Sequence, residues 1–106
     1  MNKCIKKYVK ALKNTKRKQC FGHLAYKDCR CAAGVILEDV FDWKYIRSKE
    51  SGRNVWINEN GIQVKQVFES ATDLIDSCNS WITLDITHDN DVNKLSFKEI
   101  AKEISR

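Results

Sequence analysis

The chain has 106 residues, of which 42% are hydrophobic and 31% are charged, with four glycines and no proline. This length suits one domain spanning residues 1–106, and the apolar content is too high for a wholly disordered chain. The longest apolar runs are far shorter than the ~20 residues that cross a bilayer, and no apolar stretch follows the first lysines as in a secretion signal. We therefore expect a soluble protein of the cytoplasm that does not enter a membrane.

The net charge of +5 is unevenly distributed along the chain. Residues 1–30 contain ten Lys or Arg and one acid, so they carry +9, whereas residues 31–106 contain nine Lys or Arg and thirteen acids, so they carry −4. A basic segment beside a mildly acidic one predicts an oriented approach to an acidic partner. Nucleic acid and an acidic protein surface both fit this description.

The first predicted element is an amphipathic helix over residues 3–14. Ile5, Tyr8, Val9 and Leu12 recur at helical spacing and share one face. Lysines cover the rest of this helix, and a basic run follows it in a predicted loop. The candidate partner-binding residues are Lys3, Lys6, Lys7, Lys10, Lys13, Lys16, Arg17 and Lys18.

The next segment concentrates cysteine and histidine. Cys20, His23, Cys29 and Cys31 lie within twelve residues and supply the ligand types of a structural zinc site. Standard finger spacing is absent, so the favoured interpretation is separate reduced thiols, with zinc kept as the alternative cofactor. The five cysteines are an odd number in a chain expected in a reducing compartment, so disulfides rank third. A cysteine nucleophile is also considered, although no signature of a known cysteine enzyme surrounds these residues.

Three further elements are predicted between residues 32 and 78. A helix over about residues 32–45 has a broad apolar surface, and Gly34 near its start either weakens it or lets another backbone come close. Asn60-Gly61 predicts a short β-hairpin over residues 55–64, because both central turn positions need positive φ. A helix over about residues 71–78 would start at a capping box of Ser70 and Asp73.

Towards the end of the sequence, one segment is ambiguous and one is clear. Residues 81–87 alternate apolar and polar side chains, which is strand periodicity, although tertiary contacts could make them helical. Ser96 and Glu99 form a capping box that opens a helix with Phe97, Ile100 and Ile104 on one face. Together these elements predict a mainly helical α+β domain with one short hairpin.

Three stretches of the sequence resemble a family of small phage-encoded accessory proteins of unassigned activity. They are Ala11-Leu12-Lys13-Asn14-Thr15-Lys16-Arg17-Lys18-Gln19, Cys29-Arg30-Cys31-Ala32-Ala33-Gly34-Val35-Ile36-Leu37-Glu38-Asp39, and Asn90-Asp91 with Ser96-Phe97-Lys98-Glu99-Ile100-Ala101. The family pattern reads AL-R-S-G ending with Gln, then C-C-L-G-V-L-C-D-L, then L-N-D followed by S-F-x-E-I-A. This chain departs from it where the double cysteine is split as Cys29-Arg30-Cys31 and where the Q-G-x-G glycines are replaced around Cys20 and His23.

The resemblance implies a viral protein that acts in a bacterial host cytoplasm. Our leading hypothesis is therefore a non-enzymatic phage accessory protein that docks through residues 3–18 on an acidic host protein or nucleoprotein complex and modulates or inhibits it. An inhibitor of a host defence nuclease is one specific form. The second hypothesis is a zinc-stabilised nucleic-acid-binding module built on Cys20, His23, Cys29 and Cys31, and the third is a cysteine-dependent enzyme.

Overall fold

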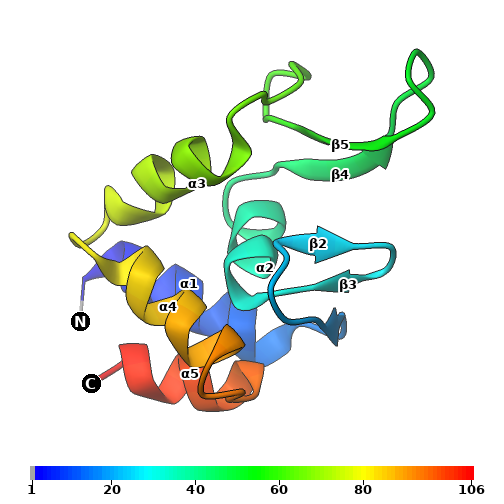
Figure 1. Ribbon diagram of the computed structural model, residues 1–106. Helices are drawn as coiled ribbons and strands as arrows, with labels where there is room; N and C mark the ends of the chain where they lie inside the picture. The colour runs from blue at the N-terminus through cyan, green and yellow to red at the C-terminus, as the bar shows by residue number, and fades with distance from the viewer. Residues whose placement is uncertain (1) are drawn as a thin grey trace.

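The structure is a computed structural model that describes residues 2–106 as a mainly helical α+β fold, as predicted. The helices are α1 (Lys3–Asn14), α2 (Ala32–Asp39), α3 (Val67–Asp76), α4 (Ile82–Asp91) and α5 (Phe97–Ile104). The strands are β1 (Lys18–Gln19), β2 (Ala25–Tyr26), β3 (Cys29–Arg30), β4 (Lys44–Arg47) and β5 (Asn54–Ile57). Figure 1 shows their arrangement, with both chain ends on the same side of the helical body.

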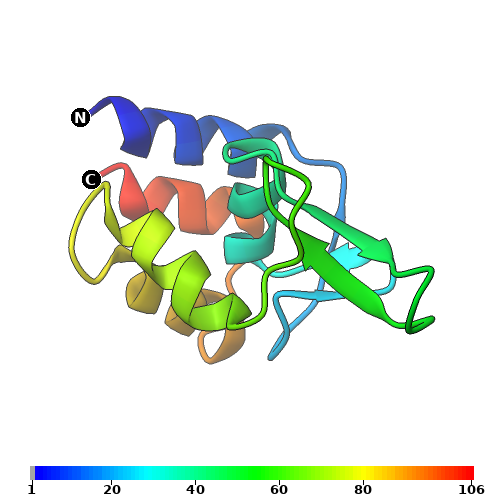
Figure 2. The ribbon, with the colours of Figure 1, turned by 90° about the horizontal axis from the view of Figure 1, so that it is seen from above.

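The helices form a layered body around α2. Helix α2 packs on α1, α3 and α4, and α5 packs on both α1 and α4. Its residues from Ala32 to Leu37 are buried, because neighbours surround the helix on every side. Viewed from above, α1 lies on one side of α2 and α5, and the α3–α4 pair lies on the other (Figure 2). Helix α1 and the α3–α4 pair therefore form opposite sides of the helical body.

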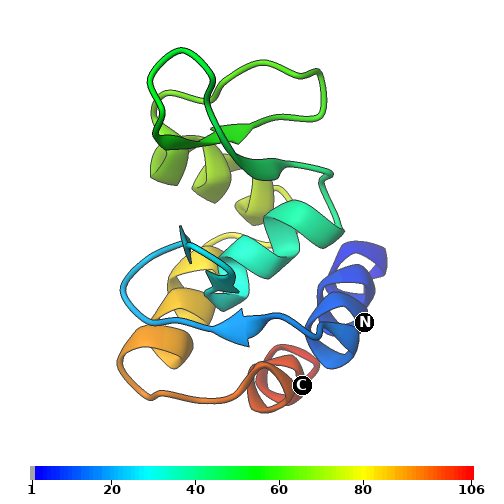
Figure 3. The same cartoon turned by 90° about the vertical axis from the view of Figure 1, so that its right-hand side faces the viewer.

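Two small sheets complete the fold. In the first, β3 is central and pairs in parallel with β1 (Lys18 opposite Cys29) and antiparallel with β2 (Ala25 opposite Arg30). The second is an antiparallel hairpin of β4 and β5, in which Tyr45 lies opposite Trp56. This β4–β5 hairpin projects from the helical body (Figure 3).

The β-hairpin is formed by β4 and β5 over residues 44–57, whereas the sequence predicted it over residues 55–64. Residues 44–47 form β4, although the sequence placed residues 44 and 45 at the end of a helix. The strand forms there because the neighbouring Trp43 packs on Trp56 and Tyr45 packs on the same indole, with ring centroids 6.2 and 5.2 Å apart. Asn60-Gly61 does form a tight turn, with Gly61 at φ 79°. A single bridge between Ile57 and Gln63 follows it, however, rather than a second strand.

Helix α2 accordingly ends at Asp39 and not near residue 45. Val40 caps its C-terminus, and Asp42 then takes a left-handed conformation at φ 62° that no helix continues through. Gly34, near the start of α2, lets the backbone of Leu24 come close, which is one of the two roles that the sequence suggested for it. A Cβ at this position would lie 2.1 Å from the carbonyl oxygen of Leu24.

Helix α3 begins at Val67, four residues before the predicted start. Gln66 is its N-cap and makes no side-chain capping bond, so the predicted capping box of Ser70 and Asp73 is wrong. The backbone N–H of Ser70 instead donates to the carbonyl oxygen of Gln66 within the first turn. The sequence signal was misleading because the helix is already formed where those side chains occur.

Of the ambiguous residues 81–87, residues 82–87 are helical and Trp81 is the N-cap of α4. Asp76, in the last turn of α3, accepts bonds from the backbone N–H and the hydroxyl of Thr83 at 2.9 and 2.7 Å, which fastens the start of α4. Ile82 and Ile86 are buried on one side of this helix, whereas Leu84 is exposed on the other. Helix α5 is confirmed, with the capping box of Ser96 and Glu99 closed in both directions.

Candidate functional site

Helix α1 is held to the body by the apolar stripe that its sequence predicts. Ile5, Tyr8, Val9 and Leu12 are all buried. The Tyr8 hydroxyl donates to the carbonyl oxygen of Ile75 at 3.0 Å, which joins α1 to α3. Burial, reinforced by the negative charge of Asp76, raises the pKa of Tyr8 to about 12. The phenol therefore remains a neutral donor over the physiological pH range.

A disulfide fastens the N-terminal end of the same helix. Cys4 and Cys78 are bonded, with Cα atoms 5.8 Å apart, so the first turn of α1 is tied to the connection between α3 and α4. Asn2 caps the helix by accepting from the N–H of Ile5 at 2.8 Å, and its amide donates to the carbonyl of Cys78 at 3.3 Å. The expectation of five reduced thiols is therefore wrong for this pair. The bond was missed because packing unites two residues that are 74 positions apart in sequence.

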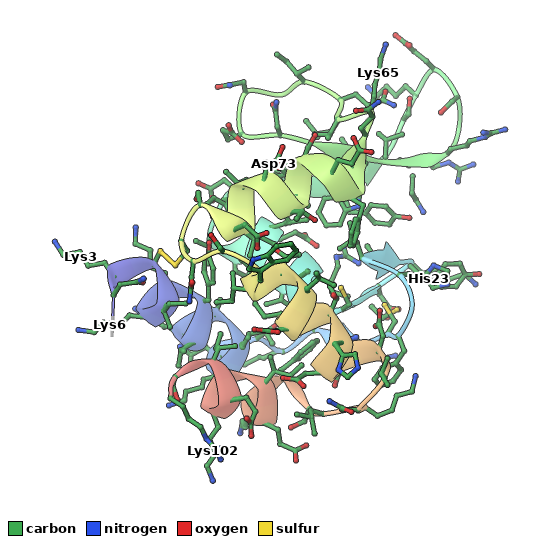
Figure 4. The ribbon with its side chains drawn as sticks, turned by 60° about the vertical axis from the view of Figure 1, so that its left-hand side comes forward. Lys3, Lys6, His23, Lys65, Asp73 and Lys102 are labelled. Atoms are coloured by element: carbon green, nitrogen blue, oxygen red, sulfur yellow. A yellow bond between two sulfur atoms is a disulfide. The ribbon has the colours of Figure 1, made fainter. Side chains whose placement is uncertain are left out.

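The solvent side of α1 carries only lysines and one asparagine. Its five lysines span an arc of about 120° around the helix axis, opposite the buried stripe. We call them the lysine face: Lys3, Lys6, Lys7, Lys10 and Lys13. All five are exposed, and none forms an ion pair within residues 2–106. Figure 4 shows Lys3 and Lys6 pointing outward from the helix.

Two further lysines come from α5, which packs alongside α1. A groove of about 290 Å³ joins the two helices and is lined by Lys13 from α1 and Lys98 from α5. Lys102 is exposed one turn further along α5 (Figure 4). Sequence reasoning missed both α5 lysines, although their spacing opposite Phe97, Ile100 and Ala101 already placed them on the solvent side of that helix.

The last three predicted binding residues fall into two groups. Lys16 is exposed and has no ion-pair partner among the residues described. Arg17 instead lies 3.1 Å from Asp39 and 3.4 Å from Glu38, and Lys18 lies 3.6 Å from Asp28. Glu38 also pairs with the buried Arg30, so Arg17 joins a network that holds the first sheet against α2.

Of the four predicted zinc ligands, the structure places the three cysteines near one another and leaves His23 apart from them. The side chain of His23 points away from the body and stacks on Tyr26, with ring centroids 5.8 Å apart (Figure 4). Cys29 donates to the carbonyl of Tyr26 at 3.0 Å. Within residues 2–106, no group of three or more His, Cys, Asp or Glu side chains is placed to hold a metal ion.

Cys31 is buried, whereas Cys20 and Cys29 are half-buried. Desolvation, a hydrogen bond with the Cys29 side chain and the proximity of the Cys29 and Cys31 thiols raise the pKa of Cys20 to about 12. Burial likewise raises the pKa of Cys31 to about 11. Both thiols are therefore protonated at neutral pH, whereas a nucleophile or a zinc ligand must be a thiolate.

A buried amide links this segment to two helices. The side chain of Asn90 donates to the carbonyl of Cys20 at 3.0 Å and accepts from the N–H of Ala32 at 3.1 Å and from Gln19 at 2.8 Å. Asn90 thus joins α4, α2 and the end of β1 through one fully satisfied side chain. Sequence reasoning offered no signal for it, because asparagine is usually exposed.

None of the helices described in residues 2–106 is long and apolar enough to cross a membrane. A scan against protein-family models finds no match to this chain, and neither does a search of curated proteins or of solved structures.

Proposed function

We propose that this protein is a non-enzymatic binding protein that uses the lysine face of α1 to dock on an acidic surface of a host complex. The observation that carries the proposal is the absence of internal partners for the five lysines of that face within residues 2–106. Ammonium groups that are exposed, adjacent and unpaired create a local positive potential that attracts an anionic partner.

The way α1 is fastened supports a binding role. A disulfide at its first turn, a buried hydrogen bond from Tyr8 and four buried side chains hold the helix against the body. None of these contacts involves a lysine side chain. The backbone positions of the lysines are therefore fixed while their ammonium groups stay available to a partner. A rigid support of this kind lowers the entropy lost when a partner binds.

The host complex is the part of this proposal that comes from the phage-protein resemblance. A small viral accessory protein would use such a face to block a host machine, and an inhibitor of a defence nuclease is one form of this activity. The partner's contact surface would be either nucleic acid or a cluster of carboxylates. Action in the host cytoplasm is a prediction. Because a cytoplasm keeps most thiols reduced, its test includes measuring whether the Cys4–Cys78 disulfide forms in the expressing cell.

The two other hypotheses have less support. A zinc module needs His23 beside the cysteines, but its side chain points away from them (Figure 4). A cysteine enzyme needs a thiolate, but the pKa of Cys20 is raised to about 12 and that of Cys31 to about 11. Neither arrangement offers the chemistry that its hypothesis requires.

The test measures the binding of two labelled polyanions, a random-sequence DNA duplex and polyglutamate, by fluorescence anisotropy as the salt concentration rises. For the duplex, about four to five phosphate contacts predict a slope of log K against log salt of roughly −4. The double variant Lys6→Glu/Lys10→Glu should weaken binding of the preferred polyanion by at least about tenfold, because two attractions become repulsions.

A matched control keeps the net charge of that variant. Lys44→Glu/Lys65→Glu changes two exposed lysines outside α1 by the same amount and should reduce binding much less. Preference for the duplex would indicate a nucleic-acid surface, and preference for polyglutamate would indicate an acidic protein. Two results would show that the lysine face is only a solvated surface. One is an equal loss of binding in the two variants, and the other is no binding of either probe at a low salt concentration of roughly 50 mM.

A further inference from the structure

Helix α4 is apolar on two opposite sides. Ile82 and Ile86 are buried against the body, whereas Trp81, Leu84 and Val92 are 70%, 56% and 64% exposed. The last three recur at i, i+3 and i+11, which places them on one solvent-facing stripe. This second apolar side also explains why residues 82–86 alternate like a strand in the sequence.

Trp81 is the most unusual member of this stripe. Trp43 and Trp56 are each 5% exposed, so Trp81 is the tryptophan that the fold leaves in solvent. Its backbone is left-handed, with φ 71° and ψ 2°, immediately before α4 begins. A bulky residue rarely takes this conformation, and such strained positions are concentrated at functional sites. Tryptophan is also among the residues that contribute most to protein interfaces.

The surroundings of the stripe are acidic. Residues 66–93 contain six Asp or Glu and no Lys or Arg. Asp85 is exposed and Asp89 is half-buried on α4 itself, and neither has an ion-pair partner within residues 2–106. Asp73 of α3 is not part of this border, because it lines a pocket with Trp43 and Glu59 on the hairpin side of that helix. Since α4 contains no Lys or Arg, the carboxylates of Asp85 and Asp89 favour a cationic partner beside the stripe.

A cavity of about 510 Å³ borders the same part of the molecule, between α4 and α5. Its lining includes the carboxylates of Asp85, Asp89 and Glu103. Arg106 also lines it and lies 3.6 Å from Glu103, which leaves the other two carboxylates without a cation. The carboxylates of Asp85 and Asp89 make this cavity more favourable for a cationic side chain than for an anionic one.

We propose that the stripe of Trp81, Leu84 and Val92, with its acidic border, is a docking surface for a positively charged amphipathic helix of a partner protein. We call it the α4 docking face. Apolar side chains of the partner would cover Trp81 and Leu84, and its Lys or Arg residues would meet Asp85 and Asp89. The negative potential disfavours nucleic acid and anionic lipid. A second copy that docked through the same face would bring the two sets of Asp85 and Asp89 carboxylates together, and like charges at an interface repel.

The test uses two synthetic probes of equal length, a Leu/Lys amphipathic helical peptide and its Leu/Glu counterpart. Calorimetric titration should show saturable 1:1 binding of the Leu/Lys peptide to the full chain. Truncation of the apolar anchors in Trp81→Ala/Leu84→Ala should weaken this binding by at least about tenfold. Asp85→Lys/Asp89→Lys should also weaken it, because the charge complementarity is reversed.

Two controls separate this surface from other exposed side chains. Ile46→Ala/Ile62→Ala removes two exposed apolar residues outside α4 and should leave the affinity unchanged. Lys6→Glu/Lys10→Glu should also retain binding of the Leu/Lys peptide, although it should lose binding of the polyanion. The proposal for the lysine face and the proposal for the α4 docking face can therefore be rejected independently of each other. Circular dichroism checks that every variant keeps the helical content of the parent.

Three results would overturn the proposal. They are equal affinity for the two peptides, equal affinity of the parent and Trp81→Ala/Leu84→Ala, and no binding of the Leu/Lys peptide. Analytical ultracentrifugation of the parent protein measures whether a second copy of the chain occupies this surface. Self-association that Trp81→Ala/Leu84→Ala abolishes, without peptide binding, would assign the surface to a second copy of the chain instead.

Discussion

Helices α1 and α4 lie on opposite sides of α2 and α5, and both have a buried apolar stripe (Figure 2). Their solvent sides differ. That of α1 consists of lysines and one asparagine, whereas that of α4 places Trp81 and Leu84 in solvent among carboxylates. The buried side of each helix explains why it folds where it does, and the exposed side indicates what it can bind.

The two helices are also fastened by different means. A disulfide and a buried tyrosine hydroxyl hold α1, whereas α4 is held by a bond that the Thr83 hydroxyl donates to Asp76 and one that Asn90 accepts from the N–H of Ala32. This difference allows the two faces to be perturbed separately.

The largest effect is expected from removing the disulfide at the start of α1. Cys4→Ser/Cys78→Ser opens a loop closed across 74 positions, so the free energy of unfolding should fall by about 4 kcal/mol. Chemical denaturation measures this change, with Cys29→Ser as a control that alters a free thiol. Thiol titration of the denatured, unreduced parent should find three reactive groups, and five would contradict the pairing.

A smaller loss is expected at the helix between the two faces. Gly34→Ala would place its methyl group 2.1 Å from the carbonyl oxygen of Leu24, so one of the two backbones must move. The free energy of unfolding should fall by about 3 kcal/mol, as for severe overpacking. The control, Gly22→Ala, faces open space, although its positive φ adds some strain of its own. Equal, small losses in the two variants would argue against close packing of α2.

A gain in stability is expected on the α4 side. Trp81→Gly replaces a bulky residue at positive φ with the residue best suited to that conformation. Since the lost ring is 70% exposed, relief of the backbone should dominate, and the free energy of unfolding should rise by about 1 kcal/mol. Thermal melting measures the change. A clear loss would mean that the indole stabilises the fold and is not held out for a partner.

The smallest effect on stability is expected at the lysine face. Lys6 and Lys10 have no ion pair to lose within the described residues, so Lys6→Glu/Lys10→Glu should change the free energy of unfolding by less than about 1 kcal/mol. Denaturation by urea checks this value. A large loss would show that these lysines support the fold.

The same contrast explains how much of the fold could be predicted from the sequence. Helix α1 was predicted to the residue because its two sides differ sharply, and α5 was predicted because Ser96 and Glu99 cap it locally. Residues 81–87 remained ambiguous because Leu84 is apolar on the solvent side of α4 and disguises the helical period. Local patterns identify a helix only where its exposed side is polar.

Other features depended on contacts between distant parts of the chain. Strand β4 is specified by the packing of Tyr45 on Trp56, eleven positions away. The disulfide joins residues from α1 and the end of α3, and no local pattern distinguishes Cys4 and Cys78 from the other three cysteines. The lysine face was predicted from α1 alone, but the pairing of Arg17 with Asp39 required the tertiary structure.

The most direct test of the central claim is an amide chemical-shift titration of the isotope-labelled protein with the polyanion it prefers. The account predicts that the shift changes concentrate on residues 3–13 and on Lys98 and Lys102 of α5, and that they diminish as salt is added. Residues 81–92 of α4 should be unaffected. Shift changes concentrated on the β4–β5 hairpin, or spread evenly over every exposed lysine, would contradict it.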